Sequence, residues 1–126
     1  MIRVLIAEDQ GMVLGALAAL LEIESDIEVV ARAHDGREAL ALAAKTDPDV
    51  VLTDIEMPNM DGFALTTAIR AHATLANIPV LILSSRSSEA DRQRGLDVGA
   101  DGYIIKSGFD ESNLLAAVNR LLGAMA

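Results

Sequence analysis

The stretch from Val50 to Gly62, VVLTDIEMPNMDG, decides the fold class of this sequence. It opens with an apolar run of the kind found in buried strands. The run ends on an acid, Asp54, which is followed by Glu56, a proline and an Asp-Gly pair that favour a turn. An acid at the end of a strand is often an ordinary loop residue, so the significance of Asp54 depends on which residues the neighbouring strands place beside it.

The same alternation of apolar runs and polar breaks extends along the chain. Five short runs rich in Val and Ile predict strands, and they cover Ile2–Ala7, Ile27–Ala31, Val50–Leu52, Val80–Leu83 and Tyr103–Ile105. Apolar residues at helical spacing follow each run, and they predict helices marked by Leu14–Leu21, Ala39–Ala43, Leu65–Ile69, Ser88–Val98 and Leu114–Leu122. The fourth of these helices is mostly charged and contains Gly95, so we expect it to be the most exposed and the least stable.

Five strands that alternate with five helices indicate an α/β fold with a parallel sheet covered on both faces. We predict a flavodoxin-like, doubly wound, five-stranded sheet of order 2-1-3-4-5. The second strand is placed at the edge because Glu28 interrupts its apolar residues. The 126 residues fit one domain with a real core, and we see no linker between separate domains.

Composition disfavours several classes of function. The formal net charge of −9 argues against nucleic acid as a direct partner and against anionic membrane surfaces, and it is compatible with cation binding. The absence of cysteine excludes disulfides and a zinc–thiolate site. The longest apolar run, Met12–Leu21, is too short to span a bilayer, and the first residues predict a strand rather than a signal peptide. We therefore expect a cytoplasmic protein.

Polar side chains follow four of the five predicted strands. The first strand ends in Glu8 and Asp9, the third in Asp54, the fourth in Ser84 and the fifth in Lys106. Each has an ordinary alternative, since Asp9 fits a helix cap, Ser84 a loop hydroxyl and Lys106 a solvated charge. In the predicted strand order, however, the four strands are adjacent, and ligands bind beyond the carboxyl ends of such strands. The set therefore predicts a binding site at this edge.

The expected chemistry is phosphoryl transfer to Asp54. Close carboxylates repel each other by roughly 1–4 kcal/mol per pair, and a divalent cation relieves that repulsion. Hard oxygen ligands suit Mg²⁺, which we expect Asp9 and Asp54 to hold with Glu8 close by. A carboxylate can act as a covalent nucleophile and form an aspartyl phosphate. Lys106 would supply a second positive charge, and the Ser84 hydroxyl would donate to a phosphoryl oxygen.

These residues resemble the receiver domain of bacterial two-component response regulators. The resemblance covers essentially the whole chain and is carried by Glu8-Asp9, Asp54 followed by Met57-Pro58 and Asp61-Gly62, Ser84, and Lys106. It implies a single receiver domain over residues 1–126, with no output domain. It also implies a sensor histidine kinase as phosphodonor to Asp54, and no enzymatic activity beyond self-phosphorylation and self-dephosphorylation.

The resemblance also implies roles for further residues. Mg²⁺ would be bound by the side chains of Asp9 and Asp54 and by the backbone carbonyl of Glu56. Ser84 and Tyr103 would form a switch pair, which would act on the surface of the fourth helix, fifth strand and fifth helix. An ordinary half-buried ring is the alternative for Tyr103.

Two positions after site residues bear on how the aspartyl phosphate behaves. Glu56 and Arg86 occupy positions that tune dephosphorylation in the family, and an ion pair between them could hinder the attacking water. Ser107 stands where family members usually have proline after a cis bond, and a non-proline cis bond costs ~2.5–4 kcal/mol. A strained cis bond and a trans bond with a displaced Lys106 loop both remain open.

The two halves of the chain resemble different receivers. Up to about Glu56 the sequence looks like receivers of helix-turn-helix transcription factors, and from about Pro58 like those of chemotaxis regulators or hybrid kinases. Natural divergence and recombination of two parents near Pro58–Gly62 both fit this difference. The face of the last helix that carries Leu121 and Leu122 fits a homodimer contact and equally fits a core.

Three other functions fit parts of this sequence. A flavin-binding electron carrier is disfavoured because Glu8 and Asp9 would repel a phosphate. An aspartate-nucleophile phosphohydrolase would explain the run VVLTDIE, with Glu56 in the second acid position, but usually carries that motif on its first strand. A chimeric or engineered scaffold with a vestigial site is the third.

Overall fold

The computed structural model describes residues 2–23, 25–84 and 88–105. The predicted fifth helix lies outside these residues, as do Arg86, Lys106 and Ser107. The fifth helix, the cis or trans state of the bond after Lys106 and the proposed contact between Glu56 and Arg86 therefore stay predictions.

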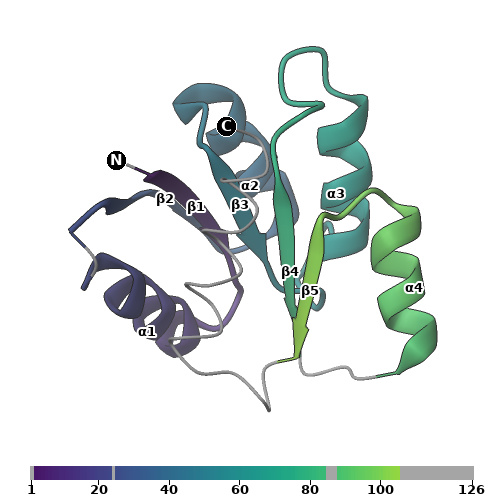
Figure 1. The fold of residues 1–126 in the computed structure, drawn as a ribbon, viewed down its shortest axis with the longest axis horizontal. Helices are drawn as coiled ribbons and strands as arrows, with labels where there is room; N and C mark the ends of the chain where they lie inside the picture. The colour runs from purple at the N-terminus through teal and green to yellow at the C-terminus, as the bar shows by residue number, and fades with distance from the viewer. Residues whose placement is uncertain (1, 24, 85–87, 106–126) are drawn as a thin grey trace.

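All five predicted strands are present, and they form one parallel sheet of order β2-β1-β3-β4-β5, as predicted (Figure 1). The strands are β1 (Ile2–Ala7), β2 (Ile27–Ala33), β3 (Val50–Thr53), β4 (Val80–Ser84) and β5 (Gly102–Ile105). β2 lies at the edge beside β1, where Glu28 is exposed, so the reason given for its placement is also confirmed.

Three strands extend beyond the end of their apolar runs. β2 continues to Ala33 because it stays paired with β1 as far as Ala7, although the register shifts by one residue between Val4 and Leu5. β3 includes Thr53, which is opposite Ala7, and β4 includes Ser84, which is opposite Ile105. Backbone pairing thus carries two buried hydroxyl residues into the sheet, where apolarity alone would have ended the strands too early.

Helices cover both faces of the sheet. α1 (Gly11–Glu22) packs its aliphatic side chains on one face, against residues such as Val4 and Leu52. α2 (Gly36–Thr46) and α3 (Gly62–Ala71) pack on the other face, and α4 (Glu89–Asp97) follows β4 beside β5 (Figure 1). Gly95 is the one buried residue of α4, so this helix is the most exposed of the four in the described part of the chain.

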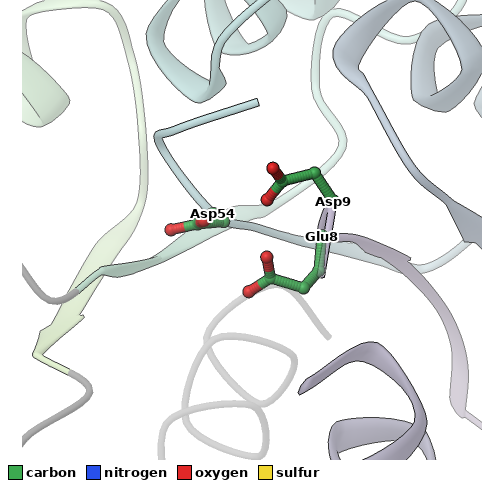
Figure 2. Close-up of side chains that lie close together, drawn as sticks. All are labelled: Glu8, Asp9 and Asp54. Carbon is green, nitrogen blue, oxygen red and sulfur yellow. The ribbon is translucent and has the colours of Figure 1, made fainter. Parts of the chain in front are cut away.

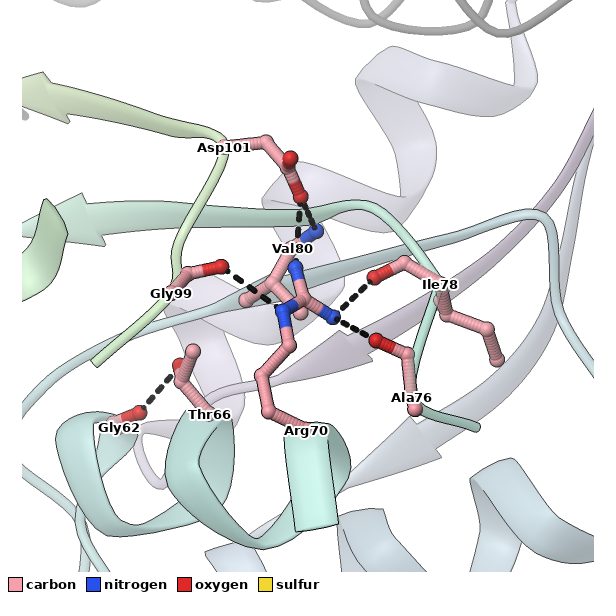
Figure 3. A network of polar contacts seen from close by, with 8 residues as sticks. All are labelled: Gly62, Thr66, Arg70, Ala76, Ile78, Val80, Gly99 and Asp101. Atoms are coloured by element: carbon pink, nitrogen blue, oxygen red, sulfur yellow. Dashed lines mark hydrogen bonds and ion pairs between the residues drawn. The ribbon is translucent and has the colours of Figure 1, made fainter. Parts of the chain in front are cut away.

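A polar network centred on Arg70 ties α3 to the amino ends of β4 and β5 (Figure 3). The guanidinium donates to Asp101 Oδ2 at 2.8 Å, and the same carboxylate oxygen accepts from the Val80 backbone N–H at 2.9 Å. The guanidinium also donates to the carbonyl oxygens of Gly99 at 2.9 Å, Ile78 at 2.7 Å and Ala76 at 3.2 Å. One side chain of α3 thereby fixes the loops that lead into both strands.

Candidate functional site

Glu8 and Asp9 follow β1 directly and differ in their surroundings. Glu8 is buried; its backbone N–H donates to the Ala33 carbonyl at 2.9 Å and its carboxylate accepts from the Gln10 N–H at 3.3 Å. Asp9 is exposed. The N-cap position of α1 is Gln10, which makes no side-chain capping bond, so Asp9 lies one residue before the cap position.

Asp54 follows β3 and is half-buried. Its backbone N–H donates to the Ala7 carbonyl at 3.0 Å, which fixes it beside the end of β1. Its carbonyl accepts from the Thr53 hydroxyl at 2.8 Å. The adjacent, parallel ends of β1 and β3 therefore bring all three predicted acids to one place, because the carboxyl ends of parallel strands meet at one edge of a sheet.

The carboxylates of Glu8, Asp9 and Asp54 converge (Figure 2). Each offers an oxygen, and these oxygens all lie within 4.8 Å of one another. The trio is the one group of this kind among the described residues. Clustered carboxylates are the hard oxygen donors that Mg²⁺ prefers, and this ion commonly uses one or two carboxylates while retaining several waters. The residues present therefore fit the predicted cation.

The turn after Asp54 is held against the acid by Gly62. Its backbone N–H donates to the Ile55 carbonyl at 2.9 Å, and a Cβ at this position would collide with the carbonyl oxygen of Asp54. Asp61 caps α3 by accepting from the Ala64 N–H at 2.8 Å. Glycine is thus required here by close approach of two backbone segments.

Ser84 and Tyr103 lie on β4 and β5, the two strands that β3 separates from β1. Ser84 is buried at the end of β4, at the same edge as the acids. Tyr103 is half-buried on β5, with its ring against Gly95 of α4 and the Arg92 guanidinium 6.0 Å from the ring centroid. Their proposed switch roles stay predictions. The catalytic role proposed for Lys106 and the tuning role proposed for Arg86 also stay predictions, because both residues lie outside the described residues. Glu56 is exposed in the turn after Asp54.

Two residues of the site were not predicted to have a role in it. Thr53 contacts the main chain of the proposed phosphoacceptor, and Gly62 packs on the same carbonyl. The sequence signal for Thr53 was a hydroxyl residue at the end of an aliphatic strand, where valine would fit as well. The signal for Gly62 was its place in the Asp-Gly turn, which indicates a turn but not what the glycine touches.

The chain matches the response regulator receiver domain over residues 4–119, and it therefore belongs to this family. It is 44% identical over 120 residues to the transcriptional regulatory protein PrrA of Mycobacterium tuberculosis, in a match that covers 95% of this chain and 49% of PrrA. It is 38% identical over 120 residues to the gliding motility regulatory protein of Myxococcus xanthus, covering 95% of this chain and 15% of that protein.

Solved structures agree with the family assignment. The receiver domain of the Francisella response regulator 1452 superposes with a TM-score of 0.90 at 32% identity, over 100% of both chains. The chain spans about half the length, or less, of the curated relatives described above.

The family and the fold together define the general function. The chain is a receiver domain of two-component response regulators, a class of signalling domains that accept phosphate from sensor histidine kinases. A flavin carrier and a phosphohydrolase are not favoured by these findings. Within residues 2–23, 25–84 and 88–105, no helix is long and apolar enough to cross a membrane.

Proposed function

We propose that Asp54 is the phosphoacceptor of this receiver and that its phosphorylation depends on Mg²⁺. The observation that carries the proposal is the convergence of the Glu8, Asp9 and Asp54 carboxylates at the carboxyl ends of β1 and β3. Asp54 belongs to the trio and follows the central strand of the sheet, which is where this fold binds its ligands.

Asp54 would act as the nucleophile. One of its carboxylate oxygens forms a bond to phosphorus, and the bond from phosphorus to the donor breaks, so that an acetyl phosphate donor leaves as acetate. Asp9 and Asp54 would hold Mg²⁺ through their side chains, with Glu8 beside them and Glu56 adding its backbone carbonyl. The bound cation would neutralise charge on the phosphoryl oxygens.

The remaining site residues would complete the charge balance and transmit the signal. Lys106 would place a second positive charge near the phosphoryl group, and the Ser84 hydroxyl would donate to one of its oxygens. The ring of Tyr103 would then turn inward and alter the surface of α4, β5 and the last helix. The exposed, weakly packed α4 is suited to a change of this kind, because few buried contacts oppose it.

We propose that Glu56 and Arg86 set how long the phosphate stays. An ion pair across the mouth of the site would hinder the attacking water, and as an exposed pair it would add only ~0–1 kcal/mol to folding stability. The lifetime of the aspartyl phosphate in Arg86→Ala tests this, with shortening expected. An unchanged lifetime would count against the pair.

The phosphodonor would be a sensor histidine kinase in the cytoplasm. The longer relatives imply that a receiver of this kind works within or beside larger regulators. Direct binding of nucleic acid by these residues is disfavoured by the net charge of −9.

Intact mass after incubation with Mg²⁺ and acetyl phosphate tests the central assignment. We expect one added phosphate on the wild type, none on Asp54→Asn and one on the control Glu28→Gln, which changes an exposed acid of the edge strand. An equal mass shift in wild type and Asp54→Asn would overturn the assignment. A wild type that binds neither Mg²⁺ nor beryllofluoride would instead favour a vestigial site, and continuous turnover of a phosphate ester would favour a phosphohydrolase.

A further inference from the structure

Thr53 is a buried hydroxyl residue at the end of an otherwise aliphatic strand. It is fully buried at the end of β3, after Val50, Val51 and Leu52. Valine has nearly the same shape and the same preference for strands, so packing alone does not require a hydroxyl here. The hydroxyl donates to the carbonyl oxygen of Asp54, the next residue, at 2.8 Å.

The main chain of Asp54 is held from three directions. Its N–H donates to Ala7 of β1, its carbonyl accepts from the Thr53 hydroxyl, and Gly62 packs against that carbonyl from the start of α3. Gly62 also donates to the carbonyl of Ile55. The peptide between Asp54 and Ile55 is therefore fixed on both sides, and of these contacts only the one from Thr53 comes from a side chain.

This peptide joins two groups of the proposed cation site. The Asp54 side chain lies before it, and the Glu56 carbonyl lies one residue beyond Ile55. A rotation of the peptide would change the direction of the Asp54 carboxylate relative to Glu8 and Asp9, and it would move the Glu56 carbonyl as well. Groups that hold the ligands of a metal in place affect its affinity although they do not touch it.

We propose that Thr53 is a positioning residue for Asp54: its hydroxyl fixes the peptide after Asp54 so that the carboxylate faces the cation and the incoming phosphoryl group. This inference rests on the proposed function. Thr53 does not take part in the reaction itself. Its effect is on how often the carboxylate and the following loop have the geometry that the reaction needs.

Thr66 offers a matched control. It is also fully buried, and its hydroxyl donates at 2.8 Å to a carbonyl, that of Gly62 four residues earlier in α3 (Figure 3). Thr53→Val and Thr66→Val each remove one buried hydroxyl and keep the side-chain shape. Only the first removes a donor to the main chain of Asp54.

The test measures Mg²⁺ affinity by calorimetry and the initial rate of phosphorylation by acetyl phosphate at saturating Mg²⁺. We expect Thr53→Val to weaken Mg²⁺ binding and slow phosphorylation, each by about tenfold, the lower end for residues that orient metal ligands. Thr53→Ser, which keeps the hydroxyl, should restore both towards wild type. Thr66→Val should lose a similar amount of thermal stability and keep wild-type Mg²⁺ affinity and rate.

Each outcome bears on the inference. Wild-type behaviour of Thr53→Val, or an equal loss in Thr66→Val, would overturn it, since the hydroxyl would then be only structural. If Thr53→Val does not fold, Thr53→Ala takes its place under the same criteria. A wild type that takes up no phosphate overturns the proposed function and this inference together, whereas a phosphorylated wild type matched by Thr53→Val overturns the inference alone.

Discussion

The two ends of the sheet differ in how their charged side chains are arranged. At the carboxyl ends of β1 and β3, three carboxylates offer oxygens within 4.8 Å of one another. At the amino ends of β4 and β5, the Arg70 guanidinium meets the Asp101 carboxylate at 2.8 Å, and three backbone carbonyls surround it. Among the described residues, like charges gather at one end, and opposite charges with well-placed acceptors gather at the other.

This difference separates residues that bind from residues that stabilise. Like charges at short range raise the free energy of the folded state, so we expect this cluster to serve binding rather than stability. A charged donor that is surrounded by acceptors lowers the free energy of the folded state, and its removal leaves those acceptors without a donor. Substitutions at the two ends should therefore have different effects on the free energy of unfolding.

The largest loss of stability is expected from Arg70→Met. The variant keeps the apolar stem but removes every hydrogen bond that Arg70 donates. We expect the free energy of unfolding to fall by about 2–4 kcal/mol, since hydrogen bonds to charged groups contribute most. Urea unfolding measures the change, with Arg37→Met as the control on the exposed side of α2. Phosphorylation should persist in the folded fraction. Equal unfolding midpoints for the two variants would show that the Arg70 network does not stabilise the fold.

A smaller loss is expected from Gly62→Ala at the acidic end. The added Cβ would collide with the Asp54 carbonyl, and overpacking against backbone costs about 1–3 kcal/mol. Because the same carbonyl belongs to the proposed phosphoacceptor, phosphorylation by acetyl phosphate should fall together with stability. Gly15→Ala serves as the control, since nothing lies within 4 Å of a Cβ built there. Full phosphorylation of Gly62→Ala would show that the close approach is structural only.

Asp9→Asn should separate binding from stability most clearly. Removing one charge from the trio relieves repulsion, so without Mg²⁺ the free energy of unfolding should stay equal or rise by up to about 1 kcal/mol. Mg²⁺ affinity should fall by at least about tenfold, because a ligand is lost. Thermal unfolding with EDTA and calorimetry with Mg²⁺ measure the two effects. A variant that is clearly less stable than wild type in EDTA would contradict the assignment of this end to binding.

The smallest effect is expected from Asp35, the N-cap of α2. Hydrogen bonds from the Glu38 N–H and from the Asn59 side chain lower the pKa of its carboxyl below the ordinary 3.8. The stability that this charge adds is present above the unfolded pKa of 3.8, and it is lost as the pH falls through the lower folded pKa. Unfolding of wild type and Asp35→Asn as a function of pH should show an advantage of wild type that shrinks in acid. A difference that stays constant would contradict this.

The sequence predicted the strand order and the acidic trio because both follow from local patterns. Apolar runs mark strands, and the parallel order then brings their polar ends together. The Arg70 network could not be predicted in this way. In the sequence Arg70 is an ordinary helix charge, and its acceptors at Ala76, Ile78 and Gly99 are backbone atoms with no signature of their own. The role of Thr53 could not be predicted for the same reason, since its hydrogen-bond acceptor is the backbone carbonyl of Asp54.

Recombination of two receivers between Pro58 and Gly62 stays a prediction, and the fold gives it a definite geometry. β2, β1 and β3 precede that loop in the sequence, and β4 and β5 follow it. The strand order keeps each set together, so the pairing of β3 with β4 is the joint between them within the sheet. Asn59 also donates to Asp35 at 2.8 Å, which ties the loop to the earlier half.

The Arg70 network has a consequence for inheritance. Arg70 and all of its partners lie between residues 70 and 101, after the loop, whereas Glu8, Asp9 and Asp54 all precede it. If two parent sequences were joined at the loop, one parent would supply the whole Arg70 network. The other parent would supply all three acids. With such a join, mutations at the two ends of the sheet would have arisen in separate parent sequences before one chain combined them.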